Sequence, residues 1–396
     1  MLKQLCSEKG KEILFCSVIL FLTIMIGMIP FTKYSNHPAS EHEERCQVLR
    51  TDNSMVFQRG IFKQGEQSVT VKLLTGPDRG REMTAMNLLQ GSVELEWFYQ
   101  PGEKAIIGYS EKDHTIVAAR MLEPVREGPL LGIFLLFFIL ILALAGWTGF
   151  KAMLSFAFSM VVIWKVLLPL NLEGRYDPVI LAMLIVAILC FVIIFLVAGF
   201  SKKGWGAFLG AFGGCIFTWI ILFLFGGMMK VNGATAGFST ALRFSGFEHL
   251  DLLKLYYAAV VLSASGAIMD IAMDISASMT EIHEKRPDIS RLELIGSGFN
   301  IGRAVIGTMT TTLLLAYSGG FMTMLMYLMS KGISLTRILN MNYVVAEMLK
   351  TVSGTIGLTL VVPLTAIICG FILVPFVEKE RIQATGAKRM KRTEVI

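Results

Sequence analysis

Residues 252–281 read LLKLYYAAVVLSASGAIMDIAMDISASMTE, a mostly apolar run that is long enough for a membrane helix. Asp270 and Asp274 lie four residues apart in it, so a helix places both carboxylates on one face, which continues to Glu281. Acidic groups in membrane-length helices are costly and usually face a bundle interior or a water-filled path. We therefore expect the functional centre of the chain here.

A second apolar stretch follows a polar segment at residues 281–300 and opens with Gly302-Arg303. Two interpretations of Arg303 stay open, because its long side chain can reach lipid headgroups or pair with Asp270 or Asp274 across the hairpin. The hairpin thus predicts a contact that a structure can test.

Four threonines follow Gly307, at positions 308 and 310–312. Successive helical residues turn by about 100°, so Thr308, Thr311 and Thr312 share one face, which would line a path with Asp270. The alternative is that these threonines return hydrogen bonds to their own helix.

The composition is that of a polytopic membrane protein. The chain has 396 residues, of which 54% are hydrophobic and 17% charged, with a mean hydropathy of +0.63. The net charge of +6 comes from lysines and arginines in short loops and tails rather than from a basic face laced with aromatic residues. The lipid bilayer is therefore the expected partner, and nucleic acid is not.

Signatures of catalysis and of metal binding are missing from the sequence. There are six cysteines, of which only Cys46 lies in the large polar segment, so no disulfide framework is expected there. No CxxC, HExxH, Walker-type glycine loop or GxSxG elbow occurs. We expect no enzyme activity, no metal and no cofactor.

The N-terminal region, residues 1–30, carries an uncharged run at 13–29 behind three lysines. A cleaved signal peptide is one interpretation, but no small-x-small pattern ends the run, where the sequence reads Met28-Ile29-Pro30-Phe31. This favours an uncleaved signal anchor with a cytoplasmic N-terminus, which places the following segment outside.

Residues 31–128 are polar and resemble a small all-β domain. Candidate strands at 68–74, 93–99, 105–109 and 115–121 are separated by turn clusters, which suits a barrel, with the OB fold as one form. His37, His42, Glu43 and Glu44 lack ligand spacing and are interpreted as a linker. The aromatic run Trp97-Phe98-Tyr99 is interpreted as barrel core rather than as a ligand platform.

Residues 129–377 are almost continuous membrane sequence. Seven helices are predicted near residues 130–145, 152–169, 179–198, 205–229, 252–272, 303–329 and 352–376. With the anchor this makes about eight transmembrane helices, and both termini are then cytoplasmic. That topology places Lys151, Lys202-Lys203, the basic group at 285–291 and the basic tail at 378–396 inside, as the positive-inside rule requires.

Small residues predict close helix packing. Gly206, Gly210 and Gly214 recur every four residues, and Gly266, Gly302 and Gly307 are small residues of the hairpin helices. Residues 230–250 are interpreted as an extracytoplasmic loop, with a re-entrant piece at 240–247 as the alternative. Residues 334–349 are interpreted as an interfacial helix without a function.

The acidic residues differ in their predicted distance from the cytoplasmic end of the helix. Asp270 lies about one turn inside the cytoplasmic end of its helix, so it is either a proton- or cation-binding carboxylate or a buried residue that locks two helices together. Asp274 and Glu281 lie nearer the cytoplasm, where solvated acids pairing with Arg286 or Arg291 are the simpler interpretation.

Several segments resemble one known family. GAIMD at 266–270, ISASMTEI at 275–282, IGR at 301–303 and GTMT at 307–310 closely resemble the YibE/F family of bacterial membrane proteins, and the likeness covers most of the chain. It implies a multipass protein of the bacterial inner membrane without an agreed biochemical activity. Asp274 departs from the family pattern, which often has a small polar residue there, and Ala304 stands where an acidic residue is frequent.

A second resemblance covers about sixty residues. An outside domain after the first helix, an Asp-containing helix and a following helix with Arg303 and three consecutive threonines are similar to the membrane core of SecD/SecF and RND proteins. This pattern implies proton-coupled work by the Asp270 helix that is transmitted to the outside domain.

Together these features predict a transporter or proton-coupled export accessory that binds a proton or cation and contacts an extracytoplasmic partner. The alternative is a non-transporting scaffold or sensor whose outside domain binds the partner. Transport predicts a polar cavity that reaches Asp270, whereas a scaffold predicts Asp270 sealed among packed helices.

Overall fold

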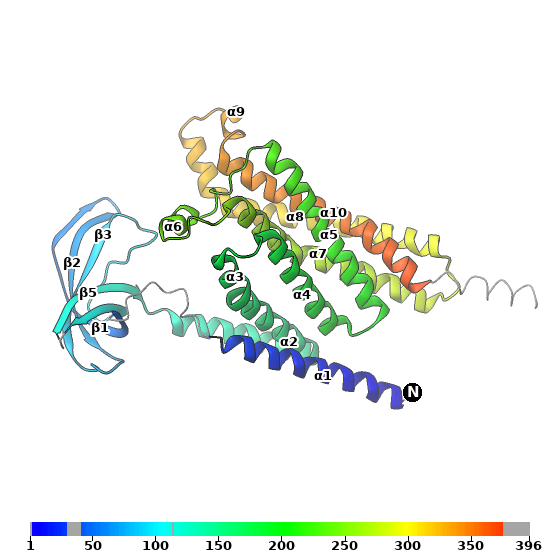
Figure 1. Ribbon diagram of the computed structural model, residues 1–396, viewed down its shortest axis with the longest axis horizontal. Helices are drawn as coiled ribbons and strands as arrows, with labels where there is room; N and C mark the ends of the chain where they lie inside the picture. The colour runs from blue at the N-terminus through cyan, green and yellow to red at the C-terminus, as the bar shows by residue number, and fades with distance from the viewer. Residues whose placement is uncertain (1, 30–40, 113–114, 375–396) are drawn as a thin grey trace, which may run out of the picture. The chain divides into compact units, whose positions relative to one another are not determined.

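The computed structural model describes residues 2–29, 41–112 and 115–374, which belong to two compact units (Figure 1). One unit comprises Met1–Pro30 and Ala145–Ile396 and is helical. The other comprises Phe31–Leu144 and contains a β-barrel and the first part of helix α2. The predicted division into apolar helices and a small β-domain is therefore confirmed.

The barrel consists of five strands, β1 (Glu41–Arg59), β2 (Phe62–Leu73), β3 (Glu82–Gln90), β4 (Lys104–Lys112) and β5 (Thr115–Pro124). The strand order is β1-β2-β3-β5-β4, and the sheet is closed because the long strand β1 pairs with both β2 and β4. The contact between β3 and β5 is parallel, and the other neighbouring strands are antiparallel.

Alternating side chains fill the barrel. Strand β3 is buried at every second residue, as expected for a strand with one face to a core. The inner residues include Cys46, Val71, Ile107 and Tyr109, each buried. Gln67 and Asn87 are polar exceptions, and the buried amide of Gln67 is satisfied by Asn53, by Asn87 and by the backbone of Tyr99.

Two predictions about the β-domain are wrong. Residues 93–99 do not form a strand, because the chain there is held by side-chain bonds: Asn87 Nδ2 donates to the Trp97 carbonyl. Tyr99 is buried in the core, whereas Trp97 is exposed. His42, Glu43 and Glu44 do not lie in a linker but in β1, where they pair with β4. No potential metal-binding group of His, Cys, Asp and Glu occurs among the described residues, and His37 lies outside them.

The helices are α1 (Leu2–Gly27), α2 (Glu127–Val162), α3 (Leu168–Glu173), α4 (Pro178–Ala198), α5 (Lys202–Met228), α6 (Ser239–Phe244), α7 (Leu252–Lys285), α8 (Arg291–Ser330), α9 (Leu335–Ile338) and α10 (Asn342–Leu373). A π-helical turn at Ile163–Leu167 joins α2 to α3.

Within the described residues, six helical segments are long and apolar enough to cross a membrane. Helix α8 makes a seventh if its two parts, bent by 49°, count as one span. Ser318, Gly319 and Gly320 lie just after the bend, and such small residues commonly permit kinks. The segment Glu127–Glu173 counts once, although Gly146 interrupts it with a non-helical φ of 52° and ψ of −124°.

The polar segment predicted at 281–300 is mostly helical. Helix α7 continues to Lys285, supported by an ion pair of 2.6 Å between Lys285 Nζ and Glu281 Oε1 one turn away. Ser290 then caps α8 by accepting a hydrogen bond from the Glu293 N–H. Only residues 286–290 therefore form the connection between the two helices.

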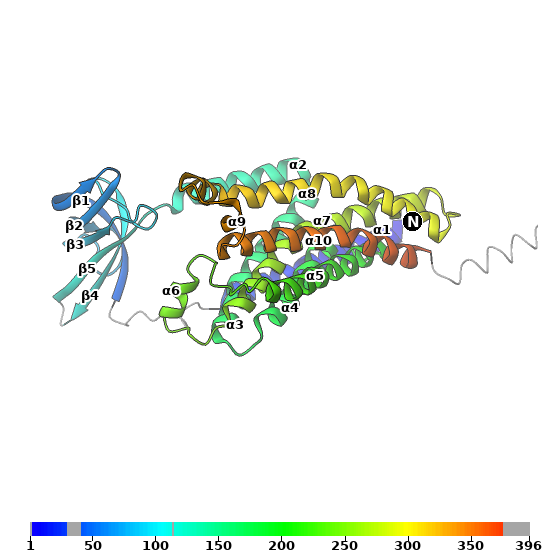
Figure 2. The same ribbon diagram turned by 90° about the horizontal axis from the view of Figure 1, so that it is seen from above.

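Helix α7 is packed among α4, α5, α8 and α10, and Figures 1 and 2 show α5, α7 and α10 running side by side. Its inner face is fully buried at Ile268, Ile271, Ile275 and Met279. The unit thus has one main apolar core, to which α7 contributes the most central side chains.

Glycines of α5 allow this close packing. A Cβ atom added at Gly206 would lie 2.4 Å from Cys369 Sγ on α10, and one at Gly210 would lie 2.1 Å from Thr365 Oγ1. At Gly214 the added atom would lie 2.8 Å from Ile268 on α7. Because these three glycines, one turn apart, have no side chains, α5 can approach α10 and α7 closely.

Candidate functional site

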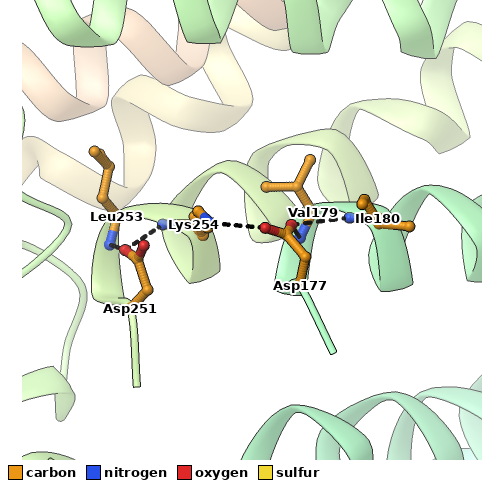
Figure 3. A network of polar contacts seen from close by, with 6 residues as sticks. All are labelled: Asp177, Val179, Ile180, Asp251, Leu253 and Lys254. Carbon is orange, nitrogen blue, oxygen red and sulfur yellow. Dashed lines mark hydrogen bonds and ion pairs between the residues drawn. The ribbon is translucent and has the colours of Figure 1, made fainter. Parts of the chain in front are cut away.

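The N-termini of α4 and α7 are joined by a polar network (Figure 3). Asp177 caps α4 by accepting from the Val179 and Ile180 N–H groups, and Asp251 caps α7 in the same way. Lys254 Nζ lies 2.7 Å from Asp177 Oδ2 and so ties the two helices together. Partial burial disfavours the ionised carboxylate of Asp177, but the bonds from Lys254 and the two N–H groups outweigh it and lower its pKa.

One narrow face of α7 is exposed along its length. From Ala259 to Asp274 its residues recur every three or four positions, and Glu281 follows two turns later; we call this set the α7 stripe: Ala259, Ser263, Gly266, Asp270, Asp274 and Glu281. The flanking residues are buried or half-buried, since α7 packs on four neighbouring helices. Within the described part of the chain, the structure therefore places both carboxylates on an exposed face of α7.

The acidic residues of the stripe differ in their partners. Asp270 and Asp274 make no hydrogen bond or ion pair within the described part of the chain. Glu281 pairs with Lys285 rather than with Arg286 or Arg291, which corrects the sequence-based expectation. Those two arginines are engaged elsewhere.

Two cavities meet the α7 stripe. The α6 cavity, of about 650 Å³, contacts Ala259 and Ser263 and is also lined by α6 and the loop before it. The Lys202 cavity, of about 620 Å³, contacts Ala277, Ser278 and Glu281 near the other end of α7. Asp270 follows Ser263 by two helical turns, or roughly 10 Å, and so lies on the stripe between the cavities.

The α6 cavity also contains an acid and a base that the sequence analysis did not identify. Glu347 and Lys350 of α10 line it, with Lys350 Nζ 3.6 Å from Glu347 Oε2. Tyr256 of α7 donates a hydrogen bond to the Ala346 carbonyl and so holds α10 against α7 at this point. The signal in the sequence was a glutamate and a lysine three residues apart at the start of an apolar run.

The prediction of an interfacial helix at 334–349 is accordingly wrong. Helix α9 is only four residues long, and Glu347 lies in the second turn of α10, which begins at Asn342. Residues 240–247 include the short helix α6, whose Leu242 lines the cavity.

A family model described as YibE/F-like protein matches residues 133–375. The chain belongs to the YibE/F-like family. No curated protein and no solved structure matches it. The family match includes α7, α10 and both cavities, so these features lie in the YibE/F-like part of the chain. The SecD/SecF pattern stays a prediction.

In this YibE/F-like chain, the polar residues of α8 do not contact the carboxylates of α7 as the sequence predicts. Arg303, Thr308, Thr311 and Thr312 are exposed. The three threonines donate hydrogen bonds to carbonyls of their own helix. Within the described residues Arg303 forms no ion pair with Asp270 or Asp274, so the hairpin contact is not present.

The hairpin glycines are not alike. A Cβ at Gly302 would lie 2.1 Å from Val362 of α10, so this glycine is a close-packing position. At Gly266 and Gly307 an added Cβ would meet no atom within 4 Å, which corrects the expectation that both serve helix packing. Gly266 lies on the α7 stripe, so its missing side chain widens the open face instead.

Proposed function

We propose that this YibE/F-like membrane protein transports a solute coupled to a proton or cation, with Asp270 and Asp274 as the coupling site. The observation that carries the proposal is the position of both carboxylates on the α7 stripe between the α6 cavity and the Lys202 cavity. A transporter needs a site that each side can reach in turn, and the stripe connects the two cavities along a single helix face.

The energetics of the stripe support a polar path. Because α7 extends to Lys285, Asp270 lies near the middle of this helix rather than one turn from its end. An acidic side chain at the centre of a membrane helix costs roughly 2.5–3.5 kcal/mol on insertion scales, so a carboxylate there opposes contact with lipid tails. Asp270 and Asp274 lie one turn apart and repel each other when both are charged. A proton or cation bound at the pair relieves that repulsion, and water in the path lowers the cost further.

The proposal includes a topology with eight spans. The break at Gly146 divides the segment Glu127–Glu173 into two parts of about 19 and 27 residues, and each part is then long enough to cross a bilayer. With α8 counted as one span, both termini lie in the cytoplasm of a bacterium and the inner membrane is the site of action. The barrel is then extracytoplasmic and contacts an export partner.

We further propose that the barrel is OB-like. Its five-stranded closed sheet, with the order β1-β2-β3-β5-β4, supports this assignment. No catalytic chemistry is part of the proposal, because the coupling site needs only to bind and release an ion.

The test is flux in proteoliposomes. The unmutated protein and Asp270→Asn are reconstituted at equal density, and proton movement is followed with an entrapped pH dye under an imposed potential. Asp288→Asn is the control, because it removes an exposed carboxylate from the connection between α7 and α8 and lines neither cavity. We expect flux with the unmutated protein and the control, and its loss with Asp270→Asn. Absence of flux in all three would favour the scaffold or sensor instead.

A further inference from the structure

The α6 cavity has the size and lining of a site for a small organic molecule. Ligand sites in proteins are typically clefts of about 300–1,000 Å³ with mostly apolar walls and a few polar groups, and this cavity has about 650 Å³. Leu167, Phe238, Leu252 and Leu255 are among its apolar lining residues. The walls come from the α2–α3 junction, the α6 region, α7 and α10, so the site is formed by tertiary packing within one unit.

Two hydrogen-bond acceptors at this cavity have no donor. Asn171 is 8% exposed, its Nδ2 donates to the Leu167 carbonyl, and its Oδ1 is buried without a hydrogen-bond partner in the described part of the chain. Glu347 Oε2 is buried and likewise accepts no hydrogen bond, although it forms an ion pair with Lys350 Nζ at 3.6 Å, which is beyond hydrogen-bond distance. A buried acceptor without a donor is costly, so both atoms favour a ligand that supplies donors.

We propose that the α6 cavity binds an amine with an apolar body, whose ammonium group donates to Glu347 Oε2. Asn171 Oδ1 accepts a further hydrogen bond from the same ligand, and the apolar walls cover the hydrocarbon part. Lys350 competes with the ligand for Glu347, so it lowers the affinity and provides a counter-charge when the cavity is empty.

This inference rests on the proposed function by naming a substrate class for it. The cavity reaches the α7 stripe at Ser263, so an amine bound there lies at the start of the path to Asp270. Binding itself requires no flux, and the two proposals therefore fail separately.

The test is equilibrium binding of radiolabelled 4-phenylbutylamine to the protein in lipid nanodiscs, with empty nanodiscs subtracted. The carboxylate 4-phenylbutyrate serves as the probe of opposite charge. We expect saturable binding of the amine and not of the carboxylate. Glu347→Gln should weaken binding roughly ten- to a hundredfold, as for a lost hydrogen bond to a charged group. Asn171→Leu should weaken it by about threefold or more.

Lys350→Met should have the opposite effect on affinity, because removing the competing ammonium group should tighten amine binding. Glu248→Gln is the control, since Glu248 is exposed and does not line the cavity. Three results would each overturn the assignment. The first is a preference for 4-phenylbutyrate over the amine, and the second is a loss of amine binding in Lys350→Met. The third is amine binding that Glu347→Gln leaves unchanged. Amine binding without flux would overturn only the transport proposal.

Discussion

The contact between α5 and α10 at Gly206 predicts a pair of substitutions whose effects cancel. Alanine at Gly206 places its Cβ 2.4 Å from Cys369 Sγ, far inside van der Waals contact, while the next neighbour, Ser276 Oγ, is 3.2 Å away. The clash is thus with one atom. Cys369→Ala removes that atom, and the Cys369 Cβ lies 3.7 Å from the new methyl group.

The magnitude follows from three opposing contributions. Overpacking a tight core costs about 1–3 kcal/mol, and replacing a helical glycine with alanine recovers about 0.5–1 kcal/mol. Taking the centre of each range, Gly206→Ala should therefore destabilise the helical unit by about 1 kcal/mol. Cys369→Ala leaves a small void and should cost about 1 kcal/mol. In the double variant the new methyl fills that void, so its stability should match or exceed that of either single variant.

The assay is thermal unfolding of the four proteins in the same detergent. Gly266→Ala is the control, since a Cβ there meets no atom within 4 Å and should be neutral or slightly stabilising. A double-mutant cycle then isolates the coupling between positions 206 and 369. The reasoning that the missing side chain of Gly206 sets the distance between α5 and α10 would be refuted by either of two results. One is that the stability losses of the two single variants simply add in the double variant. The other is that Gly206→Ala leaves the stability unchanged.

Two further predictions concern titrating groups outside the spans. Burial raises the pKa of the Cys46 thiol to about 11, so the stabilisation from keeping this thiol neutral is complete below its unfolded pKa of about 8.5 and is lost as the pH rises towards 11. Cys46→Ala should flatten the alkaline unfolding curve of the barrel, and an unchanged slope would exclude Cys46 as its cause. For Asp177, whose pKa is lowered, the stabilisation is complete above an unfolded pKa of about 3.9 and is lost as the pH falls through the folded value. Asp177→Asn should cost about 1 kcal/mol at neutral pH and reduce the acid dependence of unfolding, whereas equal acid dependence would contradict the role of the Lys254 pair.

Much of the architecture was predictable because local patterns determine it. Long apolar runs indicated the helices, and the four-residue spacing of Asp270 and Asp274 placed them on one face before any packing was known. The family was predictable too, since the segments around Gly266 and Gly302 resemble YibE/F proteins, and the family match confirms that assignment.

The remaining features depend on contacts between distant residues. The charged residues after Glu281 predict a helix end, but a Glu281–Lys285 pair and a capping serine stabilise the helices there, so α7 extends to Lys285. The sequence favours a linker at residues 42–44 because these polar residues at the start of β1 become a strand only by pairing with β4. Glu347 was overlooked because nothing in its own neighbourhood shows that α6 and α7 enclose it in a cavity.

Whether the α7 stripe faces water is the central question, and cysteine accessibility at Gly266 answers it most directly. A cysteine fits there without a clash, and it can be introduced into a background with the native cysteines replaced by serine. Leu224→Cys on α5 is the comparison, because Leu224 is an exposed apolar residue of a candidate span. We predict that a charged, water-soluble methanethiosulfonate in membrane vesicles modifies position 266 and not position 224, and that bound 4-phenylbutylamine slows the reaction. Modification of position 266 only by a lipid-soluble maleimide would contradict the account, because the carboxylates would then face lipid rather than a path.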